Sequence, residues 1–553
     1  MASSFRSRYL TKTSKWSLLN ESGGDWRVAH AESASGSVND ADAQVALDLT
    51  RSARARADAP ALWYDDGESS WSYGRLAAET AAAAAWLVAH GVQPGDRVVL
   101  VCGNWPEHVA AWYAVLAAGA VVVDVNYIVQ DEEWRYVVDD CAPAAIIGGS
   151  PFRARLEPLA AAAGDVPVLW AEACGSAWPE LVSTDSAPHE LAPVTRAADD
   201  LAVIAYTSGT TGLPKGVMHT HGAIVQQLRL LADVQGYRPD DVVYLAIPMF
   251  ALMGFLPIVA STVRGGGAVF LAERFDAAAM SRASRRYGLT YLTLSAPMLD
   301  AIIRLPDDER PTFPKLRVLT AGGAPLQPEV RARFEALVGV PLSQGYGMTE
   351  MLGVLVADYE GDAPWGSCGR IRPLDSTDMV VLDDDGQVLG AGEVGELAVH
   401  RSCVMVGYWQ RPDLYEEQFT GDWFRTGDIG KIDDDGFFYV LDRKKDVIIR
   451  GGFNIYSAEI ERVLNEHPDV AEATVVGCPD ERLGEVPVAF VVPRDADVDA
   501  DTLADALLAE TRERLGSLKT PVWVRVVEFD DLPRNALRKV HKRELRDSLR
   551  ASV

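Results

Sequence analysis

The sequence predicts an α/β protein, in which a long alternation of strands and helices precedes a smaller α+β unit. Between about residue 46 and residue 440, short apolar runs such as 97–102 and 144–149 alternate with helical patterns such as 107–119 and 328–338. An alternation of this kind is typical of parallel sheets that are covered by helices. With 553 residues, of which 48% are apolar, the chain is long enough to form two or more globular domains.

The later part of the chain has a different pattern, which starts after about residue 376. Asp-Asp-Gly turns separate strand-like runs in 379–390 and again in 430–452, and turns of this type are typical of β-hairpins. Because the spacing of a calcium-binding EF-hand loop is absent, we interpret these aspartates as turn formers rather than metal ligands. From about residue 446 onward, helical and strand-like patterns alternate, and they predict the small α+β unit.

Two further segments define the organisation of the chain. A short charged segment, LDRKKD at 441–446, separates the hairpins from the α+β unit. It is too short for a flexible linker and too charged for a core strand, so we expect a hinge. We expect residues 1–45 to form a poorly structured N-terminal arm. Their basic, Ser-rich start lacks the apolar stretch of a secretory signal, and a transit peptide is the alternative to an arm.

Charge and apolar content exclude several classes of partner. The formal net charge is −27, and so acidic a chain repels nucleic acid and anionic membranes. The longest apolar run, Val109–Val123, is interrupted by Gly119 and is shorter than the roughly 18 residues of a membrane span. We expect a core helix there that runs into a strand. The six cysteines are scattered without a C-x-x-C pair, which is typical of reduced, buried thiols in a cytoplasmic protein.

A glycine-rich loop is the first chemical signal. YTSGTTGLPKG, residues 206–216, follows an apolar run and combines glycines and hydroxyls with one lysine. Backbone N–H groups, hydroxyls and a lysine are the donors that bind phosphate oxygens. A Walker loop places glycine directly before its lysine, whereas here Pro214 precedes Lys215 and Gly216 follows it. The loop therefore predicts a phosphate site of another class, and an ordinary flexible surface loop is the alternative.

Other segments carry residues that suit the same nucleotide. In GYGMTE (345–350), Tyr346 could stack on a base and Glu350 could hold Mg²⁺, which prefers carboxylate and phosphate oxygens. In TGD (426–428), the carboxylate of Asp428 could accept both hydroxyls of a ribose. Taken singly, each has an ordinary alternative: a core tyrosine or an aspartate in a turn. Near the C-terminus, the segment LPRNALRKVHKREL at 532–545 is rich in Lys and Arg, and its ordinary alternative is a solvated helix face.

Together these segments resemble the adenylate-forming (AMP-binding) superfamily. The matching segments, in the family's order and spacing, are 206–216, AGGAPL at 321–326, GYGMTE, WFRTGD at 423–428, 442–461 and LPRNALRKV at 532–540. The resemblance covers about residues 46–547. That superfamily contains acyl-CoA and aryl-CoA synthetases, firefly-type luciferases and the adenylation domains of peptide synthetases. The segment GGFNIYSAEIE is most similar to the CoA synthetases.

The resemblance implies a division of the chain and an activity. It implies an N-terminal arm (1–45), an AMP-binding domain of two α/β subdomains plus a small β-unit (46–441), a hinge (442–445) and a mobile α+β domain (446–553). The implied reaction uses ATP to convert a small carboxylic acid to an acyl-adenylate, with pyrophosphate as leaving group, and then transfers the acyl group to CoA. ATP, Mg²⁺ and CoA are the implied cofactors. We expect a cytoplasmic monomer or homodimer without nucleic-acid partners or an integral membrane segment.

The resemblance also implies a role for each matching residue. The expected phosphate contacts are Thr207, Ser208, Gly209, Thr210, Thr211 and Lys215. Glu350 and Thr207 are the expected Mg²⁺ ligands. The expected adenine and ribose contacts are Gly322, Gly323, Ala324, Tyr346, Gly347, Thr349, Asp428 and Arg443. The expected catalytic residues are Lys539, Glu350, Thr210 and Lys215, of which Lys539 would contact the carboxylate and the α-phosphate. Lys445 is the expected hinge residue, and the expected acid pocket contains Phe250, Ala251, Gly345 and Met348.

Three positions depart from the family pattern. Ala251 stands where CoA ligases usually carry a histidine after Pro-x-Phe, Arg538 where glycine is common and Ser457 where proline is frequent. Alanine cannot hydrogen-bond a carboxylate, and the pocket segments hold no Lys or Arg. We therefore expect a fatty, alicyclic or aromatic monoacid.

Two alternatives stay open. One is a family member of specialised metabolism that adenylates an unusual partner, such as nitrite for diazotisation of an aromatic amine, or that passes the acyl group to an amine or a carrier protein. The other is a catalytically silent nucleotide-binding paralogue, against which the intact nucleotide positions and Lys539 argue.

Overall fold

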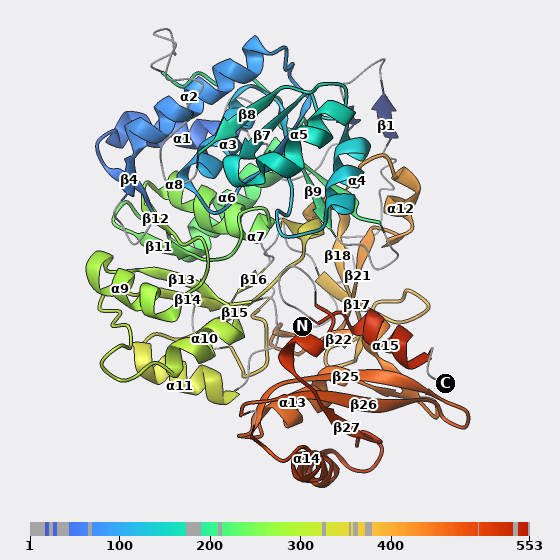
Figure 1. Cartoon of the computed structure of the whole chain (residues 1–553). Coiled ribbons are helices and arrows are strands. Elements are labelled where there is room, and N and C mark those ends of the chain that lie inside the picture. Colours follow the sequence, from blue (N-terminus) through green and yellow to red (C-terminus); the bar gives the residue numbers. More distant parts are fainter. Residues whose placement is uncertain are drawn as a thin grey trace, which may run out of the picture.

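A computed structural model gives the fold of the chain. It describes residues 17–20, 26–29, 44–64, 69–172, 178, 190–207, 213–322, 328–352, 356–357, 363–370, 379–495, 497–534 and 540–550. Figure 1 shows a large N-terminal part, built around two sheets, above a smaller C-terminal part. Within the predicted arm, β1 (Ser17–Asn20) and β2 (Trp26–Ala29) pair as an antiparallel hairpin.

The first large sheet contains the strands that follow the predicted parallel pattern. Its order is β19-β10-β9-β6-β5-β7-β8, and β6, β5, β7, β8 and β9 run parallel. The strands are β5 (Arg97–Val101), β6 (Val121–Asp124), β7 (Ala145–Gly149), β8 (Val168–Ala171), β9 (Leu201–Thr207), β10 (Lys215–Thr220) and β19 (Gly407–Tyr408). β10 is antiparallel to both of its neighbours. The two strands predicted at 97–102 and 144–149 are β5 and β7, each within one residue of its expected bounds.

The second large sheet has the order β16-β15-β14-β13-β11-β12-β3-β4. Its strands are β3 (Pro60–Tyr64), β4 (Ser69–Ser72), β11 (Val242–Leu245), β12 (Ala268–Leu271), β13 (Tyr291–Leu294), β14 (Val318–Ala321), β15 (Ser343–Tyr346) and β16 (Val356–Ala357). All neighbours pair in parallel except β4 and β16, which pair antiparallel at the two edges. The carboxyl ends of β11, β13, β14 and β15 therefore meet at one edge of this sheet.

Helices fill the space between the two sheets and cover their outer faces. The shared layer contains α1 (Ala46–Arg56), α2 (Tyr73–Ala89), α3 (Pro106–Ala117), α6 (His221–Gln235) and α8 (Ser261–Gly265), and its core cluster includes residues of both sheets. α4 (Asp131–Cys141) and α5 (Arg153–Ala162) cover the first sheet, whereas α9 (Ala277–Tyr287), α10 (Ala296–Ile303) and α11 (Pro328–Val338) cover the second.

The apolar run at 109–123 is explained by this layering. All twelve residues of α3 are buried, because the helix lies between two sheets, and β6 follows directly. The expected core helix that runs into a strand is confirmed. Among the described residues, no helix is both long and apolar enough to cross a membrane.

A small β-unit follows, as the Asp-Asp-Gly turns predict. It contains β17 (Met379–Leu382), β18 (Gly395–His400), β20 (Phe419–Thr420), β21 (Trp423–Ile432) and β22 (Phe438–Arg443), all paired antiparallel. The Asp433 carboxylate accepts hydrogen bonds from the N–H groups of Asp435 and Phe437, and Gly436 adopts a φ of 82°. Asp433 is therefore a turn former, as expected.

The C-terminal unit is a five-stranded sheet with helices on both faces (Figure 1). Its strands are β23 (Ile448–Arg450), β24 (Phe453–Ile455), β25 (Val470–Asp480), β26 (Gly484–Pro493) and β27 (Val524–Val526). α13 (Ser457–Asn465) and α14 (Ala500–Leu515) share one core cluster, whereas α15 (Lys542–Arg550) packs in the cluster of the other face. The expected α+β character of this unit is confirmed.

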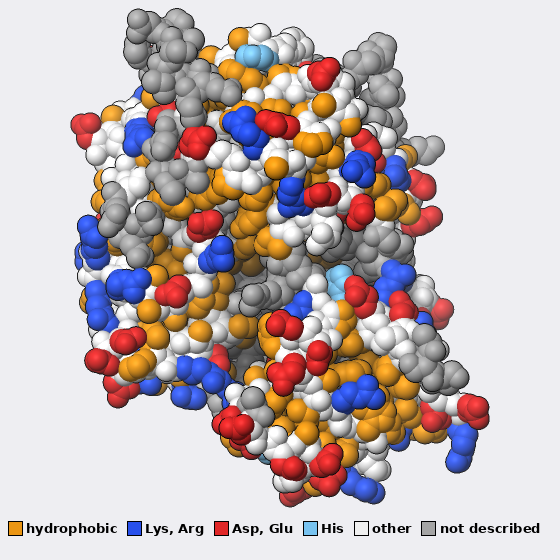
Figure 2. All heavy atoms as spheres, viewed as in Figure 1, with side chains coloured by type: hydrophobic (Ala, Val, Ile, Leu, Met, Phe, Trp, Pro, Cys, Tyr) orange, Lys and Arg blue, Asp and Glu red, His pale blue; other side chains and the backbone are white. Residues whose placement is uncertain are grey.

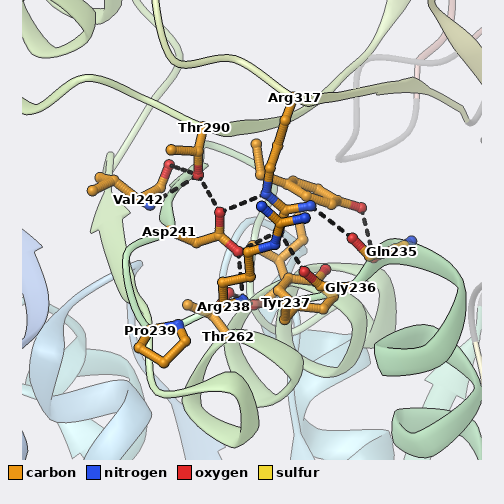
Figure 3. A network of polar contacts seen from close by, with 12 residues as sticks. Gln235, Gly236, Tyr237, Arg238, Pro239, Asp241, Val242, Thr262, Thr290 and Arg317 are labelled. Carbon is orange, nitrogen blue, oxygen red and sulfur yellow. Dashed lines mark hydrogen bonds and ion pairs between the residues drawn. The ribbon is translucent and has the colours of Figure 1, made fainter.

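A buried ion pair ties the second sheet to the helix layer. Arg317 pairs with the carboxylate of Asp241, to which its Nε donates at 2.8 Å, and donates further to the carbonyls of Gln235 and Gly236 at the end of α6. Figure 3 shows these groups converging, with the Thr290 hydroxyl also donating to Asp241 at 2.8 Å. Because the Asp241 side chain is 2% exposed, its charge depends on these partners.

The surface agrees with the acidic composition. On the face drawn in Figure 2, Lys and Arg side chains are scattered among Asp and Glu, and acidic side chains gather at the lower end of the C-terminal unit. A face of this kind offers no continuous basic stripe for a polyanion.

Candidate active site

Two neighbouring strands carry the predicted phosphate loop. β9 ends at Thr207 and β10 begins at Lys215, and these two residues pair in the antiparallel register. Both side chains are half-buried. The predicted phosphate contacts Ser208, Gly209, Thr210 and Thr211 lie outside the described residues, and their roles stay predictions.

Glu350 lies opposite the start of β10. It belongs to a short 3₁₀ turn, η5 (Thr349–Met351), and its Oε1 accepts a hydrogen bond from the Tyr408 hydroxyl at 3.1 Å. Lys215 Nζ lies 5.1 Å from the centroid of the Tyr408 ring. Because β19, which contains Tyr408, pairs with β10, the sheet itself brings the lysine and the carboxylate to one place.

The electrostatics of Glu350 suit a cation. Removal from water raises the pKa of its carboxyl above the usual value, whereas the Tyr408 hydroxyl, Arg443 and Lys215 favour the charged form. A bound Mg²⁺ would stabilise that charged form, and its other ligands would come from ATP and water. Among the described residues, no group of three or more His, Cys, Asp or Glu side chains is placed to hold a metal ion. Glu350 is thus one carboxylate whose chemistry fits Mg²⁺.

Asp428, Arg443 and Tyr346 meet beside Glu350. Asp428 on β21 pairs with Arg443 on β22, and the Arg443 Nε lies 2.7 Å from Asp428 Oδ1. The Tyr346 hydroxyl donates to Asp428 Oδ2 at 2.6 Å. The Asp428 side chain is 3% exposed and that of Arg443 is 46% exposed, so the arginine reaches from solvent to a buried carboxylate. The sequence predicted these three residues for one nucleoside, and the structure brings them together.

Gly322 of the predicted adenine pocket and Gly345 of the predicted acid pocket lie at adjacent strands. Gly322 follows β14 and Gly345 lies within β15, and a Cβ built on Gly322 would lie 3.5 Å from the Gly345 carbonyl oxygen. Gly347 and Met348 follow β15 directly, with Gly347 exposed and Met348 half-buried. Two further predicted residues of the adenine pocket, Gly323 and Ala324, lie outside the described residues.

The predicted acid-pocket segment follows β11. Phe250 and Ala251 are half-buried, and Phe250 makes an edge-to-face contact with Tyr127 at 5.4 Å between ring centroids. The Ala251 N–H donates to the Pro248 carbonyl at 3.2 Å, and its own carbonyl accepts from Gly254 at 2.7 Å. The residue that replaces the family's histidine therefore lies in a tight, internally bonded turn.

Asn104, which the sequence did not single out, holds this turn from the other sheet. Its Oδ1 accepts from the Met249 N–H at 2.9 Å, and its Nδ2 donates to the carbonyls of Ile247 at 3.0 Å and Ala272 at 3.1 Å. Asn104 is fully buried. A buried amide with all three of these bonds fixes the backbone before Phe250. Its position just before α3 was the only local signal, and such a residue ordinarily caps a helix.

The predicted hinge is partly strand. Asp442 and Arg443 end β22, whereas Lys444 and Lys445 open a short 3₁₀ turn, η7 (Lys444–Asp446). Lys444 and Lys445 are exposed, as a hinge requires. Arg546 of α15 donates to the Lys445 carbonyl at 3.0 Å. The hinge role of Lys445 stays a prediction, as does the catalytic role of Lys539, which with Arg538 lies outside the described residues.

Comparison of the amino-acid sequence with known protein families gives two matches along the chain. The family of AMP-binding enzymes matches residues 49–409, and the AMP-binding enzyme C-terminal domain matches residues 459–539. A feruloyl-CoA synthase of an Amycolatopsis species is 35% identical over 497 residues, which are 89% of this chain and 97% of that protein.

Solved structures agree with the sequence relatives. ATP-bound MatB from Rhodopseudomonas palustris is 30% identical with a TM-score of 0.82, over 91% of this chain and 98% of that one. The amide bond synthetase McbA from Marinactinospora thermotolerans is 30% identical with a TM-score of 0.79, over 91% and 99% of the two chains.

These comparisons confirm the predicted resemblance, the predicted fold class and an enzyme of the AMP-forming ligase type. They extend over both sheets, the small β-unit and most of the C-terminal unit. The chain belongs to the family of AMP-binding enzymes.

Proposed function

We propose that this enzyme uses ATP to activate a small monocarboxylic acid as an acyl-adenylate and then transfers the acyl group to CoA. The observation that carries the proposal is the convergence of three groups: Lys215 at the start of β10, Glu350 on η5, and the Asp428–Arg443 pair of β21 and β22. This arrangement offers a cation for phosphate, a carboxylate for a metal and a carboxylate for ribose within one site. The similarity of this chain to a feruloyl-CoA synthase supports CoA as the acceptor of the acyl group.

The nucleotide would be held by groups that are already oriented. Arg443 and the Tyr346 hydroxyl both contact the Asp428 carboxylate. The carboxylate would accept hydrogen bonds from the ribose hydroxyls, as acidic residues do in other nucleotide sites. Lys215 would contact the outer phosphates together with the loop that follows Thr207. The fixed carboxylate and the lysine thus set the nucleotide in place before the acid arrives.

Mg²⁺ is part of this proposal. Glu350 would hold the ion, with Thr207 as a second contact, and the ion when bound neutralises charge on the departing pyrophosphate. Lys539 would sit between the acid carboxylate and the α-phosphate, where a compact ammonium stabilises two oxygens that share developing negative charge. Removal of either positive charge leaves part of the negative charge of the reacting groups without neutralisation.

The two half-reactions would use two orientations of the C-terminal unit. We propose 46–441 as the AMP-binding domain, 442–445 as the hinge and 446–553 as the mobile domain. Rotation at Lys445 would bring Lys539 to the α-phosphate in one state and the hairpin turn at Gly451–Gly452 to the thiol in the other. Large dihedral changes at a few exposed residues are the usual way in which such rotations occur.

The acid should be apolar apart from its one carboxylate. The segment after β11 supplies Phe250 and Ala251, and the β15 segment supplies Gly345 and Met348; these side chains are apolar or absent. A second carboxylate on the substrate would find no partner among them. A fatty, alicyclic or aromatic monoacid therefore fits best.

ATP–pyrophosphate exchange with a panel of acids tests the proposal. Aromatic, alicyclic and medium-chain monoacids should support exchange, whereas dicarboxylic acids should not. Addition of CoA should then yield the acyl thioester and AMP, both identified by mass. Formation of ADP in place of AMP, or the absence of any adenine-nucleotide turnover, would contradict the proposal.

A second candidate function differs only in the acceptor. The similarity to an amide bond synthetase, together with Ala251 in place of the family's histidine, favours transfer of the acyl group to an amine. Replacing CoA by a panel of primary amines in the same assay separates the two. An amide formed faster than the thioester would make the amine the acceptor.

We further propose a cytoplasmic monomer or homodimer. The five cysteines in the described part of the chain are all free, and three of them are buried, which suits a reducing compartment. Light scattering of the purified protein would distinguish the two oligomeric states.

A further inference from the structure

One face of β10 is aimed at the turn that carries Glu350. Successive strand residues point to opposite faces, so Lys215, Val217 and His219 share a face. Val217 packs in one cluster with Met351, whereas Met218 packs in the cluster on the other side of the sheet. His219 therefore points, like Lys215, toward the segment 346–351.

His219 makes one polar contact there. Its Nε2 lies 2.8 Å from the carbonyl oxygen of Thr349, the residue before Glu350. Because a carbonyl only accepts, the imidazole must carry its proton on Nε2. Its Nδ1 has no hydrogen-bond partner among the described residues, and the residue is 1% exposed. Burial lowers the pKa of His219 to about 4, so the ring is a neutral donor near neutral pH.

The contacted turn is held at several successive points. The Thr349 carbonyl also accepts from the Leu352 N–H at 3.2 Å, and Leu352 adopts a left-handed φ of 58°, which is unfavourable for a side chain of this kind. The Glu350 carbonyl accepts from Met405 at 2.7 Å, and the Glu350 side chain accepts from Tyr408. Surrounding bonds of this sort keep an unfavourable backbone conformation in place.

The strand itself is adjusted at this position. The pairing of β10 with β9 shifts register between His219 and Thr220, so that Thr220 pairs with Leu201 instead of Ala202. Register shifts of this type re-aim side chains and are frequent next to active sites. The shift falls at the residue that contacts the Thr349 turn.

We infer that His219 is a positioning residue for the nucleotide site: its Nε2–H fixes the Thr349 carbonyl and thereby the direction in which Glu350 presents its carboxylate. The inference rests on the proposed role of Glu350 toward the ATP-bound metal. It assigns no proton transfer to the imidazole. It also links the phosphate-loop strand to the metal-binding turn, so that displacement of one displaces the other.

A set of three variants tests the inference. His219→Gln retains an N–H at nearly the reach of Nε2, whereas His219→Leu removes the donor. His221→Leu is the matched control, because His221 is equally buried and neither of its ring nitrogens has a partner in the described part of the chain. We expect His219→Leu to raise the KM for MgATP in pyrophosphate exchange roughly tenfold, the size expected for one lost hydrogen bond in a site. The KM for the acid should change much less, His219→Gln should restore most of the loss, and His221→Leu should retain the wild-type KM for MgATP.

A binding measurement covers the case of poor activity or folding. Mn²⁺ binding in the presence of ATP, followed by electron paramagnetic resonance, reports the metal site without turnover, and urea unfolding shows whether each variant is folded. Weaker Mn²⁺ binding in His219→Leu than in His221→Leu supports the inference. Equal Mn²⁺ affinity and equal KM in these two variants, or a His219→Gln as impaired as His219→Leu, would overturn it. Failure of the proposed function would instead show as a wild-type protein without exchange for any acid.

Discussion

The Ser457 hydroxyl donates a hydrogen bond to Asp442 Oδ2 at 2.8 Å, across the segment that the sequence predicts as a hinge. The Asp442 carboxylate also accepts from the Ala458 N–H at 3.2 Å, and Lys542 donates to the Ser457 hydroxyl at 2.8 Å. Lys542 in turn pairs with Glu461 at 2.7 Å. A buried chain of bonds therefore joins the end of β22 to α13 and α15, and it begins at a serine where the family often has proline.

This chain of bonds should oppose opening at the hinge. Ser457→Ala removes the hydrogen bond to Asp442 and the one from Lys542. Each is worth about 1 kcal/mol, so the population of opened hinge should rise at least about fivefold. The expected result is faster tryptic cleavage after the exposed Lys444 and Lys445, measured by mass spectrometry. Thr520→Ala is the control, because the Thr520 hydroxyl donates to the nearby Gly516 carbonyl within the C-terminal unit and makes no other hydrogen bond among the described residues. Equal cleavage rates in the two variants would contradict the role of Ser457.

Asn104 should control the acid pocket more than the nucleotide site. Asn104→Ala leaves the Met249 N–H without its buried acceptor, and an unsatisfied buried group costs about 1–3 kcal/mol. We expect kcat/KM for the acid to fall roughly tenfold or more, with a much smaller change in the KM for ATP. The control is Asn126→Ala, because the Asn126 side-chain oxygen accepts from the Ile128 N–H two residues on, its one side-chain hydrogen bond within the described part of the chain. An unchanged kcat/KM for the acid would show that the Phe250 turn holds its shape without Asn104.

The fold was predictable wherever the signal is local. β5, β7, α3 and α11 follow from the spacing of apolar residues, and the turn at Asp433–Gly436 follows from the residue types that turns require. The arrangement of two sheets around one shared helix layer was not predictable from such spacing. It depends on contacts between residues far apart, such as those that bury α3 on every side.

The site divides in the same way. Lys215, Glu350 and Asp428 were predicted because each stands in a motif that is recognisable along the chain. Asn104 and His219 were not assigned roles, because their partners are backbone atoms 143 and 130 residues away. The backbone of a distant segment leaves no pattern in the sequence, so positioning residues of this kind emerge only from the fold.

The buried pair of Arg317 and Asp241 should dominate the stability of the second sheet. Arg317→Met leaves the Asp241 charge buried without its guanidinium partner and removes the arginine's hydrogen bonds to two carbonyls. The loss of one partner of a buried pair costs about 3–5 kcal/mol. We expect the free energy of unfolding of the N-terminal part, measured by urea denaturation, to fall by that amount. The comparison is Arg304→Met, which breaks an exposed pair with Asp300 and should cost less than about 1 kcal/mol. Equal losses in the two variants would contradict the assigned role of the buried pair.

Lys539→Ala tests the chemistry of the first half-reaction. If the ammonium neutralises charge between the acid and the α-phosphate, its loss should raise the barrier to adenylate formation by about 3–4 kcal/mol, as for the loss of one key donor. Pyrophosphate exchange should fall accordingly, by about 10²–10³-fold. Thioester formation from a supplied acyl-adenylate should change far less, because that step would use the other proposed orientation of the C-terminal unit. Near-normal exchange would remove Lys539 from this role.

His221 should make the folded protein sensitive to acid. Burial, with a smaller contribution from nearby Arg196, lowers the pKa of His221 to about 3, whereas an unfolded chain has a histidine pKa of about 6.5. Above about pH 6.5, His221 is neutral in both states and does not make the free energy of unfolding depend on pH. As the pH falls from about 6.5 toward 3, only the unfolded state takes up the proton, so the free energy of unfolding decreases.

The size of this effect is set by one proton. Between about pH 6 and pH 4.5, His221 should contribute about 1.4 kcal/mol of lost stability per pH unit. Urea unfolding across that range should show a shallower slope for His221→Leu by that amount, whatever the variant loses in packing at neutral pH. If the slope of His221→Leu equals that of the wild type, the imidazole of His221 takes up its proton in the folded state as readily as in the unfolded state, which would contradict the prediction.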